Sequence, residues 1–168
     1  LGFDDTSLFE EIVDAIASAN ANTLSIHART KKQGYTAPAY WPFIAKAAEN
    51  FPSAIIANGE IWTKEDAYEC VVQSKTKNVM LGRGILATPN LASTIRENND
   101  AMSWGELKRL LVTYSEKELN GDKSYYFSSR LKQWLRYIRL QYEEGELLFQ
   151  AIKLLKSKDE ILAILNKH

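Results

Sequence analysis

The stretch Ala54-Ile55-Ile56-Ala57-Asn58-Gly59-Glu60 joins a short, continuous apolar run to a polar turn that contains glycine. Two similar stretches flank it in this 168-residue chain: Thr23–His27, and Asn78–Leu81 with the following Gly82-Arg83-Gly84. Helical patterns precede all three. Apolar runs that do not alternate with polar residues favour parallel strands covered on both faces. The repeat of helix, strand and polar loop therefore predicts units of an α/β barrel.

Three strands are too few for a closed barrel, which needs eight and typically about 250 residues. We therefore expect residues 1–99 to form part of a TIM barrel, about its last three strands. From Ser103 onwards, apolar residues recur at helical spacing. A break at Asn120-Gly121-Asp122 separates a first helix from a second over Ser124–Tyr142. Residues 100–168 are thus predicted to form a bundle of three or four helices, and the fold class is α/β plus all-α.

Charge is balanced over the whole chain but not along it. Lysines and arginines number 21, as do aspartates and glutamates, so the formal net charge is zero. Lys123–Tyr142 nevertheless holds five basic residues and no acidic one, which predicts a local basic helix. Cys70 is the single cysteine, so an internal disulfide framework is excluded and a reducing, cytoplasmic compartment is expected. No apolar run reaches about 18 residues, which excludes a predicted membrane helix, and no metal site is predicted.

Polar side chains and glycines follow each predicted strand, where parallel barrels carry their functional groups. His27 ends the first strand, Asn58-Gly59 the second and Gly82-Arg83 the third. Glycine allows close approach of the backbone to a ligand, free amides can hold phosphate oxygens, and arginine can pair with phosphate through two nitrogens. Each motif could also be a plain turn, or a histidine satisfied by backbone groups. Two such motifs on consecutive strand ends favour a phosphate site.

Taken in order, these motifs resemble those of tRNA-dihydrouridine synthases. The first two are His27-Ala28-Arg29-Thr30 with Gly34-Tyr35, and Ile56–Ile61; the third is Met80-Leu81-Gly82-Arg83-Gly84. The opening Leu1-Gly2 resembles the end of the family's fifth strand. Arg130–Leu135 resembles the C-terminal domain of the C-type subfamily. The resemblance covers nearly the whole chain.

The resemblance implies a reaction on RNA. Such enzymes reduce the C5–C6 double bond of selected tRNA uridines, with FMN as cofactor and NADPH as reductant, while a cysteine protonates C5. C-type resemblance implies uridine 16 of the D-loop, and a tRNA held by the barrel and the helical domain. Residues 1–99 would then be part of the FMN-binding barrel, and residues 100–168 the tRNA-binding domain.

The resemblance also implies roles for particular residues. The FMN site would be formed by His27, Asn58, Gly59, Glu60, Gly82 and Arg83. The tRNA would be contacted by Tyr35, Arg130, Lys132, Tyr137 and Lys153, the last standing where the family favours arginine. Cys70 lies among apolar residues of a predicted helix and should be a packed, inert thiol. The catalytic cysteine is expected in the N-terminal half of the barrel, so this chain alone should be inactive.

Other interpretations stay open. The chain could be a non-catalytic RNA-binding or interaction module, or part of another flavin barrel such as a dihydroorotate-dehydrogenase-like enzyme, although the basic helix argues against the latter. The chain lacks an initiating Met, so we expect it to start inside a longer gene product. Three parallel strands leave unpaired edges, which predicts self-association or cover by a preceding N-terminal segment.

Overall fold

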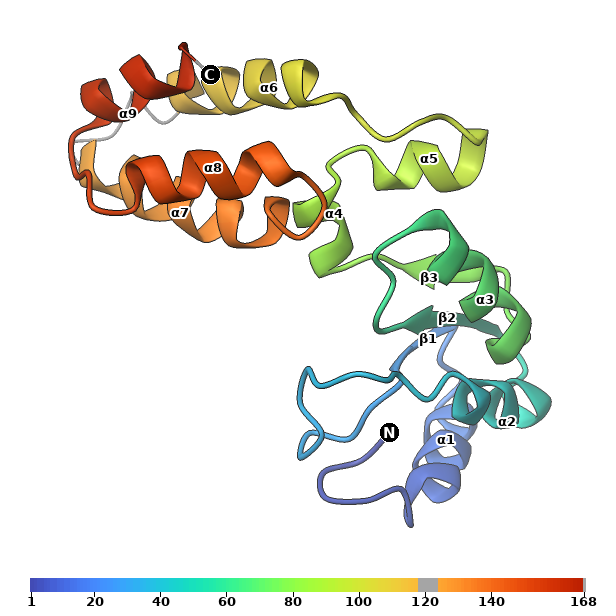
Figure 1. Ribbon diagram of the computed structural model, residues 1–168. Coiled ribbons are helices and arrows are strands. Elements are labelled where there is room, and N and C mark those ends of the chain that lie inside the picture. Colours follow the sequence, from blue (N-terminus) through green and yellow to red (C-terminus); the bar gives the residue numbers. More distant parts are fainter. Residues whose placement is uncertain (118–123, 168) are drawn as a thin grey trace. The chain divides into compact units, whose positions relative to one another are not determined.

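A computed structural model describes residues 1–117 and 124–167 of the chain (Figure 1). It separates into two compact units, Leu1–Gly82 and Arg83–His168. This division falls earlier than the boundary expected near Asn98–Ala101. The reason is that the short helix α4 (Arg83–Ala87) packs against α7 (Ser124–Ile138) of the helical unit. The predicted helix break at Asn120-Gly121-Asp122 lies outside the described residues.

The first unit contains the three predicted strands as one parallel sheet. These are β1 (Thr23–His27), β2 (Ala54–Asn58) and β3 (Asn78–Met80), in the spatial order β1-β2-β3. Helix α1 (Phe9–Ser18) precedes β1, α2 (Pro42–Asn50) connects β1 to β2, and α3 (Lys64–Ser74) connects β2 to β3 (Figure 1). A parallel sheet with helical crossovers followed by a helical region is the partial TIM barrel that the sequence predicted.

The opening residues lie beside the segment that follows β1. Gly2 forms a parallel bridge with Thr30. The Lys31 N–H donates to the Gly2 carbonyl and the Lys32 N–H to the Phe3 carbonyl, both at 2.9 Å. This pairing fits the expectation that Leu1-Gly2 is the end of a preceding strand.

The strands are less buried than their apolar sequences predicted. Ile26, Ile55 and Ala57 are buried, but Thr23 and Met80 are exposed. The prediction of cover on both faces is therefore wrong for β1 and β3. These two are the edges of the sheet, whereas the central β2 packs against both α2 and α3.

Capping explains where α3 begins. The Thr63 side chain accepts a hydrogen bond from the Asp66 N–H, and the Asp66 carboxylate accepts one from the Thr63 N–H, a reciprocal capping box. The predicted cap at Ser103 is likewise present, because Ser103 and Glu106 exchange the same two bonds at the start of α6 (Trp104–Lys117). The first residue of both helices could therefore be predicted from the spacing of polar residues in the sequence.

The second unit is helical, as predicted. After α4 come α5 (Leu91–Glu97), α6, α7, α8 (Glu143–Ile152) and α9 (Lys158–Leu165) (Figure 1). Its core of buried apolar side chains comes from α6 to α9: Leu107, Leu111, Phe127, Leu131, Leu135, Ile138, Leu148, Ile152, Ile161 and Leu165. Within the described ranges, no helix combines the length and the apolar character that crossing a bilayer requires.

Helix α7 ends at Ile138 rather than at Tyr142 as predicted, because the chain turns there into α8. Gly145 makes the close packing after this turn possible. A Cβ at this position would lie 2.9 Å from Ile138 Cγ2 and 3.2 Å from the Arg139 nitrogen. Only a residue without a side chain avoids that overlap.

Helices α4 and α5 were not predicted from the sequence. The Trp134 indole N–H of α7 donates to the Leu86 carbonyl of α4 at 2.8 Å. Asn90 lies just before α5 and accepts the Met102 N–H at 2.8 Å while donating to the Asp100 carbonyl at 2.9 Å. These long-range bonds hold two short helices that have little helical signal of their own.

Candidate functional site

Two predicted site residues lie next to each other at the carboxyl-terminal end of the sheet. His27 and Asn58 are register partners at the carboxyl ends of β1 and β2. Because paired residues of neighbouring strands point to the same side of a sheet, both side chains can face a common ligand. The Asn58 Nδ2 also donates to the Met80 carbonyl at 2.8 Å, which ties the ends of β2 and β3 together. Polar groups thus gather where a barrel carries its active site.

A buried ion pair lies beside this edge. The Arg29 guanidinium pairs with the Glu60 carboxylate, and its Nε donates to the Pro38 carbonyl at 3.2 Å. The Arg29 side chain has no exposed surface, whereas that of Glu60 is 23% exposed. Glu60 also accepts the Trp62 indole N–H at 2.9 Å. The acid predicted to line the flavin is therefore also tied into the protein by two neighbours.

The remaining nitrogen of Arg29 bears on whether a flavin fits. Arg29 Nη1 is buried and has no hydrogen-bond partner among the described residues. A buried donor without an acceptor costs about 1–3 kcal/mol. An electron-rich ligand oxygen would satisfy it, and flavin carries ring carbonyl oxygens as well as a phosphate. The donor set of imidazole, amide and guanidinium groups is compatible with such a ligand.

The two predicted glycines differ in their surroundings. Gly59 has φ +122°, which favours glycine, and a Cβ there would lie 3.4 Å from Ala39 Cβ. Its carbonyl accepts the Trp41 indole N–H at 2.9 Å. The backbone conformation, rather than crowding, therefore favours glycine at this position. Gly82, by contrast, has no atom within 4 Å of the position of a Cβ, so the space beside it is open.

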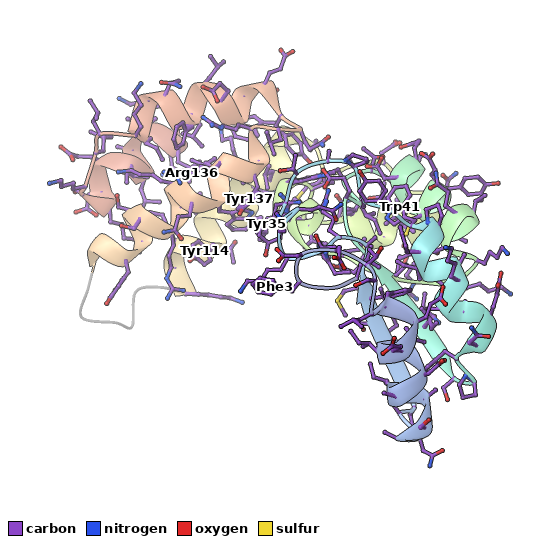
Figure 2. The ribbon with its side chains drawn as sticks, turned by 90° about the horizontal axis from the view of Figure 1, so that it is seen from below. Phe3, Tyr35, Trp41, Tyr114, Arg136 and Tyr137 are labelled. Atoms are coloured by element: carbon purple, nitrogen blue, oxygen red, sulfur yellow. The ribbon has the colours of Figure 1, made fainter. Side chains whose placement is uncertain are left out.

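The loop between β1 and α2 carries the predicted RNA contact Tyr35. This side chain is 72% exposed, and its ring lies edge-on to that of His27 at 6.3 Å between centroids. Figure 2 labels Tyr35 on this loop and Trp41 at its end, just before α2. The Tyr40 N–H donates to the Ala28 carbonyl at 2.8 Å and anchors the loop to the end of β1. A predicted RNA contact and a predicted flavin contact are thus neighbours.

The predicted RNA contacts of the helical unit have different environments. Arg130 is exposed and Tyr137 half-buried, and they lie seven residues apart, two turns of α7. Figure 2 labels Tyr137 and its neighbour Arg136. Lys132 donates to the Leu155 carbonyl, which also accepts the Ser128 hydroxyl at 3.1 Å. Its ammonium group thus holds α7 to the loop before α9.

Two further basic residues lie outside this arrangement. Lys153, just after α8, is exposed and donates to Gln150 at 2.5 Å. Arg83 begins α4 and belongs to the second unit, whereas Asn58 belongs to the first. A phosphate shared by Arg83 and the Asn58 turn therefore stays a prediction.

Comparison with known proteins now decides the family. The family model described as dihydrouridine synthase matches residues 1–165. The chain belongs to the dihydrouridine synthase family. Curated relatives named tRNA-dihydrouridine(16) synthase include those of Shewanella oneidensis and Escherichia coli K12. They are 41% identical over 167 residues and 40% identical over 162 residues. The alignments cover 99% and 96% of this chain but 53% and 51% of the relatives.

The relative from Vibrio parahaemolyticus bears the same name and is 42% identical over 154 residues, which is 91% of this chain and 48% of the relative. The chain thus spans about half the length of the curated relatives it matches. Dihydrouridine synthases are flavin-using oxidoreductases. Membership of a flavin-using family therefore agrees with a ligand site at the strand ends that carry His27 and Asn58.

Cys70 of this dihydrouridine synthase chain has the environment of a structural thiol. It lies on α3 with no exposed surface. Burial raises the pKa of the thiol from 9.0 to about 11, while a hydrogen bond with Ser74 acts in the opposite direction. A thiol that a substrate cannot reach, and that burial makes a weaker acid, is a poor candidate for proton transfer to a substrate.

Sequence reasoning missed three residues of this site. Arg29, Trp41 and Trp62 bind the turn Asn58–Glu60 or its neighbours from inside the protein. The available signal was the motif His27-Ala28-Arg29-Thr30, which directly follows the first strand. Pairing with Glu60 needed the register of β1 and β2, which the sequence alone does not give.

Proposed function

We propose that the full-length protein reduces uridine 16 of tRNA to 5,6-dihydrouridine, with FMN as cofactor, NADPH as reductant and the cytoplasm as its location. The observation that carries the proposal is that His27 and Asn58 are register partners at the carboxyl ends of β1 and β2. Beside them, the buried Arg29 has one guanidinium nitrogen without a hydrogen-bond partner among the described residues. The names of the relatives from three bacteria support the choice of position 16.

Each part of this chain has a stated task in the proposal. His27, Asn58, Gly59, Glu60, Gly82 and Arg83 would hold the flavin. Bound FMN would supply the hydride for C6 of the uridine. The residues of this chain would bind and orient flavin and tRNA. They would not transfer the proton, because Cys70 is enclosed and its raised pKa makes it a weak acid. The proton for C5 would come from a cysteine elsewhere in the full-length protein, so this chain alone should form no dihydrouridine.

The tRNA would lie against Tyr35 and the exposed basic positions of the helical unit. Arg130 and Tyr137 occupy one side of α7, and Lys153 follows α8. Lys132 would act by holding α7 in place as well as by its charge, given its bond to the Leu155 carbonyl. Contacts from such groups to phosphates give affinity without sequence reading, and they weaken as salt rises.

The decisive experiment measures two properties of the full-length protein. Purified protein should carry flavin, seen by its absorbance, and should form dihydrouridine at position 16 of unmodified tRNA in the presence of NADPH, detected by mass spectrometry of tRNA fragments. Flavin binding with modification at another position would refute the assignment of uridine 16. RNA binding without flavin would instead favour the non-catalytic RNA-binding module.

A variant pair tests the proposed RNA surface. Arg130→Gln should lower the slope of log affinity for tRNA against log salt by about one, as loss of one phosphate contact does. Arg96→Gln removes an exposed arginine from α5, outside the predicted set, and should leave the slope unchanged. If Arg130→Gln and Arg96→Gln show the same slope of log affinity against log salt, Arg130 does not belong to the proposed RNA surface.

A further inference from the structure

One buried side chain connects the segments around the candidate site. Arg29 follows β1, its Nη2 pairs with Glu60 just beyond β2, and its Nε donates to Pro38 in the loop before α2. Further bonds tie the same segments together. The Ala28 N–H donates to the Asn58 carbonyl at 2.9 Å, and the Ala28 carbonyl accepts the Tyr40 N–H at 2.8 Å. Two of these segments contain predicted contacts, Asn58 to the flavin and Tyr35 to RNA.

The backbone conformation of Glu60 indicates that its bond to Arg29 holds the turn in place. Glu60 has φ +55°, a left-handed conformation that side chains other than glycine, asparagine and aspartate rarely adopt. Its carboxylate meets both the Arg29 guanidinium and the Trp62 indole N–H. A strained residue persists only where its surroundings hold it. Here the buried charge of Arg29 is the strongest such partner, because an unpaired charge inside a protein is highly unfavourable.

We propose that Arg29 is a positioning residue of the candidate flavin site. By holding Glu60 and the Pro38 carbonyl together, it fixes the turn Asn58–Glu60, where flavin is proposed to bind, and the loop 31–41, which carries Tyr35. The flavin part of this inference rests on the proposed function. The part that concerns the loop does not, because the bonds that define it lie within the protein.

The test uses the full-length protein and three variants. Arg29→Met removes the guanidinium but keeps a long apolar side chain. The double variant Arg29→Met with Glu60→Leu removes both charges together, which usually preserves folding where the single change does not. Lys32→Met is the matched control, because Lys32 lies in the same loop but is exposed, with a distant Asp4 as partner at 3.7 Å. Circular dichroism and thermal melting establish that each variant is folded.

Two readouts separate positioning from direct contact. The first is the Kd for FMN, from quenching of flavin fluorescence on binding. The second is hydrogen exchange of the Tyr40 amide in the flavin-free protein, since that amide bonds to the Ala28 carbonyl. We expect Arg29→Met to raise the Kd at least tenfold and to speed exchange at Tyr40 at least tenfold. If that variant does not fold, exchange at Tyr40 in the double variant decides, because Glu60 is itself a predicted flavin contact. Lys32→Met should match the parent protein in both.

Each other outcome has a definite meaning. A raised Kd with unchanged exchange at Tyr40 would mean that Arg29 acts only by touching the ligand, and would overturn the positioning role. Parent-like values of both quantities in a folded variant would overturn it as well. If the parent protein binds no FMN, the proposed function fails, while the exchange of Tyr40 still decides whether Arg29 holds the loop.

Discussion

Replacement of Gly145 by alanine tests the close packing of α8 against the end of α7. The added methyl group would lie 2.9 Å from Ile138 Cγ2, and 3.2 Å and 3.3 Å from the nitrogen and Cα of Arg139. Two of these three atoms belong to backbone and cannot rotate away, so the helices must shift. Overpacking of this kind costs about 2 kcal/mol. Alanine returns up to about 1 kcal/mol through its greater helix propensity, so we expect a net loss of about 1 kcal/mol.

Gly105→Ala is the matched control. Gly105 also lies near the start of a helix of the same unit, and the nearest atom to its added methyl would be Arg109 Nη1 at 3.9 Å. This variant should gain stability by up to about 1 kcal/mol. The two variants should therefore differ by about 2 kcal/mol, or roughly 10 °C in Tm for a unit of this size. Thermal unfolding followed by circular dichroism measures the difference. Equal Tm values would refute the steric argument.

Three further predictions follow from single contacts. The stability of the chain should fall between pH 9 and pH 11, because Cys70 has a raised pKa in the folded state and the unfolded chain loses its thiol proton first. Cys70→Ala should flatten that dependence in urea unfolding measured across this pH range. Asn90→Ala breaks the bond from the Met102 N–H and that to the Asp100 carbonyl, and should lower the free energy of unfolding by about 1–2 kcal/mol. Trp134→Phe should lower it by about 0.5–1.5 kcal/mol through the bond to Leu86, and an unchanged urea midpoint would count against that bond.

The main elements of the fold could be predicted because their signals are local. Apolar runs such as Ala54–Ala57 gave the strands, and the spacing of Thr63 and Asp66 gave the start of α3. Apolar residues at helical spacing gave the bundle. Each of these signals depends on residues close together in the chain, so the sequence alone carries them.

Features that depend on distant contacts could not be predicted. Helix α4 is held by Trp134, 48 residues from Leu86, and its packing on α7 moved the boundary between the units to Gly82. Lys132 looked like a basic surface residue, yet it bonds to Leu155 from 23 residues away. The same limit hid the partner of Arg29, which is 31 residues distant.

At the candidate site, the register of the sheet places His27 and Asn58 next to each other at the carboxyl ends of β1 and β2. The predicted flavin and RNA contacts themselves stay predictions. The Asn58–Glu60 motif does lie at the carboxyl end of β2, as its sequence predicted. What the motif could not reveal is that Gly59 packs against Ala39 and that Glu60 is bonded from within.

Tryptophan fluorescence can report on the turn Asn58–Glu60, because two indole N–H groups donate hydrogen bonds to it. Of the four tryptophans in the chain, Trp41 donates to Gly59 and Trp62 to Glu60, whereas Trp104 and Trp134 belong to the helical unit. Emission from Trp41 and Trp62 should therefore respond to any molecule that enters beside the turn, without an added dye. Replacing both Trp104 and Trp134 by phenylalanine would remove the background from the helical unit and leave a built-in optical reporter of ligand entry.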